Sequence, residues 1–354
     1  MVTFLSARDV ARLVQRVGAR QFWFRLVDYL RQDFSRWRDF DKSPRFASHS
    51  PGGVIELMPT SDGETFAFKY VNGHPGNTAL CLQTVVAFGA LADVETGYPI
   101  FLSDMTLATA LRTAATSVLA ASRLARPESR TMALIGLGAQ SEFQASAFRE
   151  VLGVDRLRVF DVDAEATEKF VRNMAPVELE ITRCVDARSA AEGADIVTTI
   201  TADKKRATIL GDDMIAAGTH INAVGGDCPG KTELARALLL RSDIFVEYAP
   251  QTRIEGEIQQ LAPEHPVTEL HELLTGAHAG RTSPGAVTIF DSVGFALEDF
   301  AVLRLLRDLA RETGVGTEIE LTAAPANPKD LFALLQPQSE RRRTPSRDAV
   351  NLAD

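Results

Sequence analysis

Short apolar runs rich in branched residues alternate with amphipathic stretches from about residue 131 onward. Runs of this length are typical of buried parallel strands, and the stretches between them have the spacing of helices that cover a sheet. The predicted strands lie at 131–135, 157–160, 179–182, 195–201, 220–224, 243–246 and 287–290. We therefore expect an α/β domain with a Rossmann-type, doubly wound parallel sheet over residues 129–294.

The first 128 residues follow a different pattern. Residues 7–40 carry apolar positions at helical spacing. Strand patterns separated by turn residues follow at 53–58, 65–71, 84–93 and 99–102. This mixture predicts a separate α+β domain.

Two further helical stretches connect the predicted domains. An alanine-rich helix over 106–124 leads from the first domain to the first Rossmann strand. Residues 293–313 are helical again, and we expect residues 295–335 to return to the first domain and complete it.

Composition limits the binding partners and the cellular location that we expect. The 354 residues have a formal net charge of −9 and a pI near 5.3, which argues against nucleic acid and anionic membranes as partners. No run approaches the roughly 20 apolar residues of a membrane span, and the N-terminus does not have the pattern of a signal peptide. Three scattered cysteines suit a reducing compartment, so we expect a cytoplasmic protein.

The tail at 336–354 has almost no apolar content and is predicted to be mobile. Its three adjacent arginines allow a second interpretation, an arm that binds nucleic acid. The acidic character of the whole chain favours a solvated tail.

A glycine-rich turn directly follows the strand at 131–135. Gly136 can form the tight turn, Gly138 allows close approach of a pyrophosphate, and the next helix offers free amides at its N-terminus. Ser141 stands where the usual motif has a third glycine. Asp161, about 20 residues on, can accept hydrogen bonds from both ribose hydroxyls, so we predict NAD rather than NADP as the cofactor.

Four charged residues before residue 129 are candidates for chemistry. Arg45 and Arg112 could each bind a carboxylate, although a solvated surface arginine is an equal alternative. Lys69 lies in an apolar strand, where alternation alone favours an outward-facing side chain. Glu56 lies in a similar strand and needs a partner or water.

A second glycine-rich turn follows the strand at 220–224, at the sheet edge where ligands bind in such folds. Asp227 in this turn is predicted to face the nicotinamide and the substrate. Cys228 could be a nucleophile, but a small residue in a tight turn explains it equally well and is the interpretation we prefer. No histidines have the spacing of metal ligands, and we expect no metal.

Six segments read together resemble the ornithine cyclodeaminase and μ-crystallin family, in the same order from about residue 40 to 330. The segments begin at Arg45, Phe68, Thr109, Gly136, Asn222 and Phe290. The resemblance implies that the first domains of two subunits pair into a closed β structure, so that the protein is a homodimer. It also implies an enzyme that acts on a small basic amino acid, L-ornithine.

The resemblance assigns roles to individual residues. Arg45, Lys69 and Arg112 would gather the substrate α-carboxylate, which replaces the outward-facing interpretation of Lys69. Val293 would touch the substrate, and Glu56 and Asp227 would lie near its amines, with Asp227 as acid and base. Contacts to NAD are implied for Thr84, Arg112, Thr113, Ala139, Gln140, Asp161, Thr201, Val224, Gly225, Gly226, Asp227, Lys231 and Ser292, in addition to Gly136 and Gly138.

The expected reaction is an internal redox cycle. Hydride leaves the α-carbon of ornithine for NAD, the side-chain amine, deprotonated by Asp227, attacks the resulting imine, and ammonia departs. Return of the hydride to the cyclic imine gives proline. Because ornithine and proline plus ammonia have the same oxidation level, NAD is regenerated in each turnover. A charge near Asp227, from Lys69 or the substrate, is expected to keep its carboxylate ionised.

Three alternatives remain open from the sequence. One is an amino-acid dehydrogenase or ketimine reductase on the same fold, against which the pair of Glu56 and Asp227 argues. Another is a cyclodeaminase for lysine or a different diamino acid, because one methylene discriminates by only about 1–3 kcal/mol. The last is a non-catalytic nucleotide carrier, which would not need the complete set of charged residues.

Overall fold

The computed structural model describes residues 1–202 and 207–336. The tail predicted to be mobile lies, apart from Gln336, outside the described residues. The larger sheet is all-parallel with strand order β13-β12-β14-β11-β10-β7-β8-β9. Its strands are β7 (Thr131–Ile135), β8 (Arg156–Phe160), β9 (Glu180–Arg183), β10 (Ile196–Thr199), β11 (His220–Ala223), β12 (Asp243–Val246), β13 (Thr268–Glu269) and β14 (Thr288–Asp291). The predicted parallel sheet is confirmed; β13, with two residues, was not predicted.

Alternating residues of β7 show why both faces of this sheet must be covered. Met132 and Leu134 are buried in a core with helices on one face, whereas Ala133 and Ile135 are buried in a second core on the other face. A strand buried on both sides has no polar face, which explains the continuous apolar runs in the sequence. Helices of this part are α4 (Ser141–Leu152), α5 (Ala164–Met174), α6 (Ala187–Ala191), α7 (Arg236–Leu240), α8 (Ala249–Glu255) and α9 (Leu270–Leu274).

The smaller sheet has seven strands in the order β15-β1-β6-β5-β4-β3-β2. Its strands are β1 (Val2–Leu5), β2 (Phe46–Ser50), β3 (Gly53–Ser61), β4 (Thr65–Gly73), β5 (Ala87–Asp93), β6 (Pro99–Asp104) and β15 (Thr317–Ile319). Strands β1, β2 and β15 were not predicted. In β1 only the first and last residues are buried, β15 is mostly exposed, and every residue of β2 is exposed, so none of the three shows apolar alternation.

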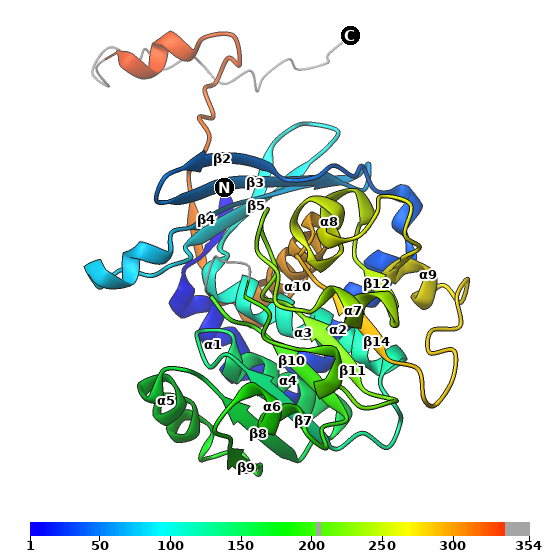
Figure 1. The fold of residues 1–354 in the computed structure, drawn as a ribbon. Helices are drawn as coiled ribbons and strands as arrows, with labels where there is room; N and C mark the ends of the chain where they lie inside the picture. Colours follow the sequence, from blue (N-terminus) through cyan, green and yellow to red (C-terminus); the bar gives the residue numbers. More distant parts are fainter. Residues whose placement is uncertain (203–206, 337–354) are drawn as a thin grey trace, which may run out of the picture.

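Long helices lie between the two sheets (Figure 1). They are α1 (Ala7–Val17), α2 (Ala19–Ser35), α3 (Thr106–Leu124) and α10 (Ala296–Thr313). α3 has the predicted bounds, and α10 begins three residues later than predicted. α10 packs against both α2 and α3 and contacts β3, β4 and β5. This helix, late in the chain, therefore returns to the elements formed by the first 128 residues.

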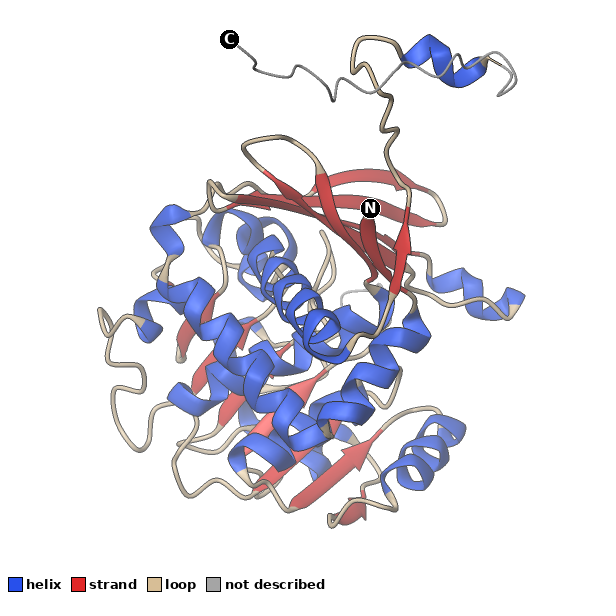
Figure 2. Cartoon of the chain, turned by 180° about the vertical axis from the view of Figure 1, so that it is seen from behind, coloured by secondary structure: helices blue, strands red, loops and turns tan. Residues whose placement is uncertain are grey.

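Helices cover only one face of the seven-stranded sheet (Figures 1 and 2). On β4, Ala67, Lys69 and Val71 point into the molecule, while the residues between them point outward. After β15 the chain runs away from the body of the molecule to the short 3₁₀ helix η5 (Leu331–Leu335) (Figure 2).

Candidate functional site

The first glycine-rich turn joins β7 to α4. Gly136 has a φ of +96°, and a Cβ on this residue would lie 2.9 Å from the backbone of Ile200. A side chain here would therefore be both strained and obstructed. A Cβ on Gly138, in contrast, would meet nothing within 4 Å, which leaves the backbone open to a ligand. Ser141 begins α4, and its hydroxyl donates to the carbonyl of Gly138 (2.8 Å).

A cavity of about 410 Å³ lies beside this turn. The residues lining it that were predicted from the sequence are Gly136, Gly138, Asp161 and Thr201. One Asp161 oxygen accepts from the Leu137 amide (2.5 Å) and the other from the Asp163 amide (2.8 Å). The carboxylate is thus held against the glycine turn, with lone pairs left for further donors.

A lysine that sequence reasoning missed also reaches the first turn. Lys169 on α5 donates to the carbonyl of Gly138 (2.9 Å) and pairs with Glu142 (3.1 Å). Its charge favours an anion at the turn.

The second glycine-rich turn packs on two buried glutamates. A Cβ on Gly225 would lie 2.2 Å from the carboxylate of Glu233, and one on Gly226 would lie 2.6 Å from that of Glu257. Only glycine fits at either position without displacing a carboxylate. Glu233 in turn accepts from the amide (3.1 Å) and the hydroxyl of Thr201, and this connects the second turn to the cavity.

Asp227 follows these glycines, and its side chain is 55% exposed. Its neighbouring cation is Lys231, with Nζ 3.5 Å from Asp227 Oδ1 and 2.7 Å from the carbonyl of Thr201. Lys69, which the sequence analysis placed near Asp227, forms its ion pair with Asp299. Lys231 is itself one of the predicted cofactor residues.

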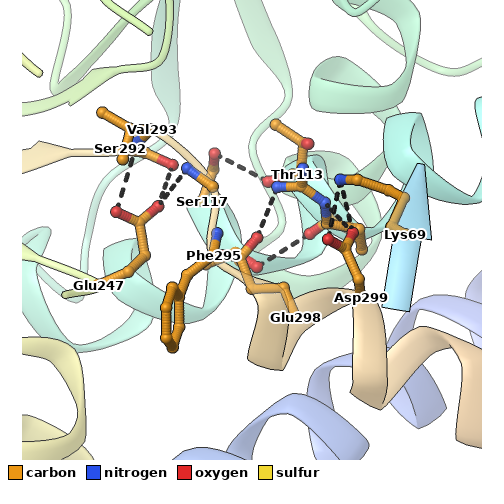
Figure 3. Close-up of polar contacts among 12 residues, drawn as sticks. Lys69, Thr113, Ser117, Glu247, Ser292, Val293, Phe295, Glu298 and Asp299 are labelled. Carbon is orange, nitrogen blue, oxygen red and sulfur yellow. Dashed lines mark hydrogen bonds and ion pairs between the residues drawn. The ribbon is translucent and has the colours of Figure 1, made fainter. Parts of the chain in front are cut away.

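Lys69 and Arg112 meet on one carboxylate of α10, that of Asp299. Figure 3 shows Lys69 pointing toward this carboxylate. Asp299 lies 2.8 Å from Nζ of Lys69 and 3.1 Å from Nε of Arg112, and Glu298 lies 2.7 Å from Nη1 of Arg112. Lys69 is only 1% exposed. The interpretation from alternation, an outward-facing lysine, is therefore wrong. The solvated-surface alternative for Arg112 is also wrong, because the side chain is buried.

Arg45 directly precedes β2 and lies near Lys69 and Arg112. Its side chain is 8% exposed. Its Nη1 lies 3.1 Å from Glu56, its Nε lies 3.1 Å from Glu255, and its Nη2 donates to the carbonyls of Val293 (2.6 Å) and Gly294 (2.8 Å). Arg45 too is buried and paired, so it is not a solvated surface residue.

The turn at residues 292–294 brings the two arginines together. A Cβ on Gly294, whose φ is +77°, would lie 2.6 Å from Arg112 Nη1. Glu247 holds this turn by accepting from the Ser292 hydroxyl (2.6 Å) and from the Val293 and Gly294 amides (3.3 and 3.2 Å) (Figure 3). The predicted residues Ser292 and Val293 are thereby fixed next to Arg45 and Arg112.

The buried charges change the proton affinities of this region. Burial lowers the pKa of Lys69 to about 8, and the charges of Arg112 and Arg45 act in the same direction, although Asp299 opposes them. Burial raises the pKa of Glu247 to about 7, as does the neighbouring Glu298. For Arg45, burial lowers the pKa, but the carboxylates around it outweigh burial and raise the pKa above its ordinary value.

The other predicted cofactor residues are less closely tied to the cavity. Thr113 is buried on α3, Ala139 and Gln140 lie in the first turn, and Val224 donates its amide to the carbonyl of Thr199 (3.0 Å). Thr84 lies between the 3₁₀ helix η2 (Pro75–Leu80) and β5, where its carbonyl accepts from the His74 amide (2.9 Å). No contact places Thr84 at the cavity among the described residues.

Sequence reasoning missed most of the carboxylates that pair with the predicted cations. Glu298 and Asp299 stand side by side in the otherwise apolar start of α10, and such a charged pair within a buried helix was a usable signal. Glu247 and Glu255 had no comparable signal, because their burial depends on how the loops fold.

The sequence and the fold are both similar to those of known proteins. The model of the ornithine cyclodeaminase/mu-crystallin family matches residues 8–314. The chain belongs to this family. The ornithine cyclodeaminase of Agrobacterium fabrum is 58% identical over 343 residues, which cover 97% of this chain and 97% of the relative.

Solved structures of this family have the same fold. A lysine cyclodeaminase, described as showing recognition of L-lysine, L-ornithine and L-2,4-diaminobutyric acid, has a TM-score of 0.87 at 34% identity and covers 94% of this chain and 99% of its own. An archaeal alanine dehydrogenase dimer with bound NAD has a TM-score of 0.83 at 30% identity, and the match covers 91% of this chain and 99% of the dehydrogenase chain. The predicted family resemblance and the Rossmann-type α/β fold are both confirmed.

Within residues 1–202 and 207–336, no three histidine, cysteine, aspartate or glutamate side chains group as metal ligands would. In the same ranges, no helix is both long and apolar enough to cross a membrane.

Proposed function

We propose that this chain is an NAD-dependent cyclodeaminase that converts L-ornithine to L-proline and ammonia, an enzyme of cytoplasmic amino-acid metabolism. The observation that carries the proposal is the buried cluster in which Arg45, Lys69 and Arg112 converge, with Glu56 beside them. A cationic clamp with an adjacent carboxylate suits an amino acid that carries a second amine. The high identity to curated ornithine cyclodeaminases supports this assignment.

The first turn fits a dinucleotide. The positive φ of Gly136, the open space at Gly138 and the carboxylate of Asp161 at the end of the next strand suit a pyrophosphate and a ribose. NAD, when bound, supplies reversible hydride transfer at the substrate α-carbon. We propose that it is held by Thr84, Arg112, Thr113, Gly136, Gly138, Ala139, Gln140, Asp161, Thr201, Val224, Gly225, Gly226, Asp227, Lys231 and Ser292.

The substrate α-carboxylate is proposed to bind Arg45, Lys69 and Arg112, near Val293. Each of these cations is already charge-paired, Arg45 with Glu56 and Glu255, and the others with Glu298 and Asp299. The pairs hold the side chains in place before the substrate arrives, which lowers the ordering cost of binding.

Asp227 is proposed as the acid and base, and it also contacts the substrate. Its exposed carboxylate can receive a proton from an entering ammonium, and Lys231 Nζ lies 3.5 Å from it. With its distal amine deprotonated, ornithine can close the five-membered ring, and Asp227 can return the proton to the departing ammonia.

A lysine cyclodeaminase is the second candidate function. It is supported by the fold similarity to a lysine cyclodeaminase whose described ligands include both lysine and ornithine. One methylene is worth only about 1–3 kcal/mol of discrimination, so both diamino acids must be assayed.

We further propose a homodimer formed through the outer face of the seven-stranded sheet. This face carries exposed apolar side chains: Phe46, Ile55, Leu57, Phe66 and Phe88. Phe46 opposes Leu57 on neighbouring strands and is 67% exposed, and exposed apolar patches mark protein contacts. We propose two domains on this basis. Residues 1–128 with 295–335 form the substrate-binding and dimerisation domain, and residues 129–294 form the NAD-binding domain.

The test is incubation of the protein with L-ornithine and a catalytic amount of NAD. The proposal expects proline and ammonia in equal amounts with no net NADH. Stoichiometric NADH, without proline, would instead indicate an amino-acid dehydrogenase, and no reaction with bound NAD would indicate a carrier. L-lysine assayed in parallel distinguishes the second candidate.

A further inference from the structure

Three carboxylates surround Arg45. Glu56 and Glu255 each have an oxygen 3.1 Å from its guanidinium, and Asp227 is close enough to act on the charge of both Arg45 and Glu255. Neither Glu56 nor Glu255 is more than 12% exposed. In the proposed function, Glu255 only holds Arg45 in place.

The charges in this group do not balance. Arg45 supplies one positive charge against the two buried carboxylates Glu56 and Glu255, whereas the exposed Asp227 has Lys231 beside it. The neighbouring cations Lys69 and Arg112 are paired with the carboxylates of α10. Burying negative charge without a partner is costly. Burial raises the pKa of Glu255 to about 7; Arg45 opposes this shift, and Glu56 and Asp227 add to it. A cationic ligand group would compensate the excess.

Glu255 also has hydrogen-bonding capacity to spare. Although Glu255 Oε2 and Arg45 Nε lie 3.1 Å apart, both atoms are buried, and neither makes a hydrogen bond with any residue of the described chain. The pair is therefore held by charge, with poor alignment. An ammonium offers three donors on a compact charge and can satisfy such an oxygen.

The backbone fixes where this side chain points. Glu255 is the last residue of α8, and its carbonyl accepts from the side chain of Gln259 (3.2 Å). Gln251 on the same helix accepts from the Arg45 amide (3.2 Å) and donates to the carbonyl of Gly294 (2.7 Å). The helix that carries Glu255 is thus attached to the turn that holds Arg45.

We infer that Glu255 is a specificity-determining residue that accepts the distal ammonium of a diamino acid, together with Glu56 and Asp227. The α-carboxylate then binds Arg45, Lys69 and Arg112, and the distal amine lies toward the three carboxylates. The inference rests on the proposed function for its substrate class, but it concerns binding and can be measured without turnover.

The experiment compares L-ornithine with L-norvaline, which has the same carbon skeleton without the distal amine. Calorimetric titrations use the protein saturated with NADH, which prevents oxidation of the ligand, at pH 8, where Glu255 is ionised. The Glu255→Gln variant is expected to weaken ornithine binding by about tenfold or more and to change norvaline binding by less than about twofold. Glu255→Asp, which keeps the charge, is expected to restore part of the preference.

The control is Glu264→Gln, the same change at an exposed glutamate, which should change the binding of neither ligand. Equal weakening of both ligands in Glu255→Gln would overturn the inference, because it would mean that Glu255 only positions Arg45. Unchanged ornithine binding would also overturn it. The proposed function fails separately, if the unaltered protein makes no proline while still binding ornithine more tightly than norvaline.

Discussion

The two binding regions of this molecule are built in different ways. The cofactor cavity is formed by consecutive turns at the ends of parallel strands, and backbone conformation at Gly136 and Gly138 dominates its shape. The substrate cluster is formed by charged side chains from segments far apart in the chain, including Arg45, Lys69 and Asp299. A backbone site depends on local sequence, whereas a site of paired charges depends on the whole fold.

The largest expected effect comes from Asp227, which lies between the two regions. Asp227→Ala should lower turnover by about 10²–10⁴-fold, because the acid and base is removed. The affinity for NAD, measured by fluorescence titration, should change little. Loss of NAD binding with the same variant would instead mean that the main role of Asp227 is to hold the cofactor, not to transfer protons.

The substrate cluster should be sensitive to loss of a single charge even without ligand. Lys69→Met leaves Asp299 buried with one partner fewer, and it should lower the free energy of unfolding by about 3–5 kcal/mol in denaturant titrations. Lys329→Met, at an exposed lysine, is the matched control and should be neutral. A Lys69→Met protein of unaltered stability would contradict the view that this region is held together by charge pairs.

Two alanine variants in the cofactor turn should distinguish the effect of backbone strain from the effect of ligand contact. Gly136→Ala should destabilise the protein without NAD by about 1–3 kcal/mol, since alanine must adopt φ +96° against the backbone of Ile200. Gly138→Ala should leave the stability without NAD nearly unchanged, because the new Cβ meets no protein atom within 4 Å. The same Cβ should weaken NAD binding, because it occupies space that the cofactor needs. Thermal unfolding with and without NAD measures both, and identical behaviour of the two variants would refute the distinction.

The smallest expected effect is a pH dependence of the substrate cluster. Lys69 must be protonated to attract a carboxylate, and its pKa lies at about 8 because it is buried. The value of kcat/KM should therefore fall by about tenfold per pH unit above about pH 8, after correction for the substrate's own amines. A profile that stays flat through pH 9 would show that the charge of Lys69 is not needed.

The sequence predicted the parts of this molecule that are encoded locally. The parallel sheet followed from apolar runs such as residues 131–135, and the cofactor turn from Gly136, Gly138 and the later Asp161. The strands β1, β2 and β15 escaped prediction because none of them alternates buried and exposed residues.

The substrate cluster could not be derived in this way. Alternation suggested that Lys69 faces outward, and only the family resemblance assigned it to the site. Its partner Asp299 lies 230 residues further along the chain, so no local pattern could connect them. Glu255 is recognisable only after α8 and the turn at 292–294 have been placed around Arg45.

The central claim is that the redox chemistry at the α-carbon is undone within each turnover. The most direct test uses L-ornithine deuterated at the α-carbon, with unlabelled NAD in catalytic amount, and measures the label in proline by mass spectrometry. The account predicts that proline keeps the deuterium at the carbon that bears its carboxylate, in ordinary water. Proline that has lost the deuterium, or deuterium that accumulates in the cofactor without proline, would contradict it.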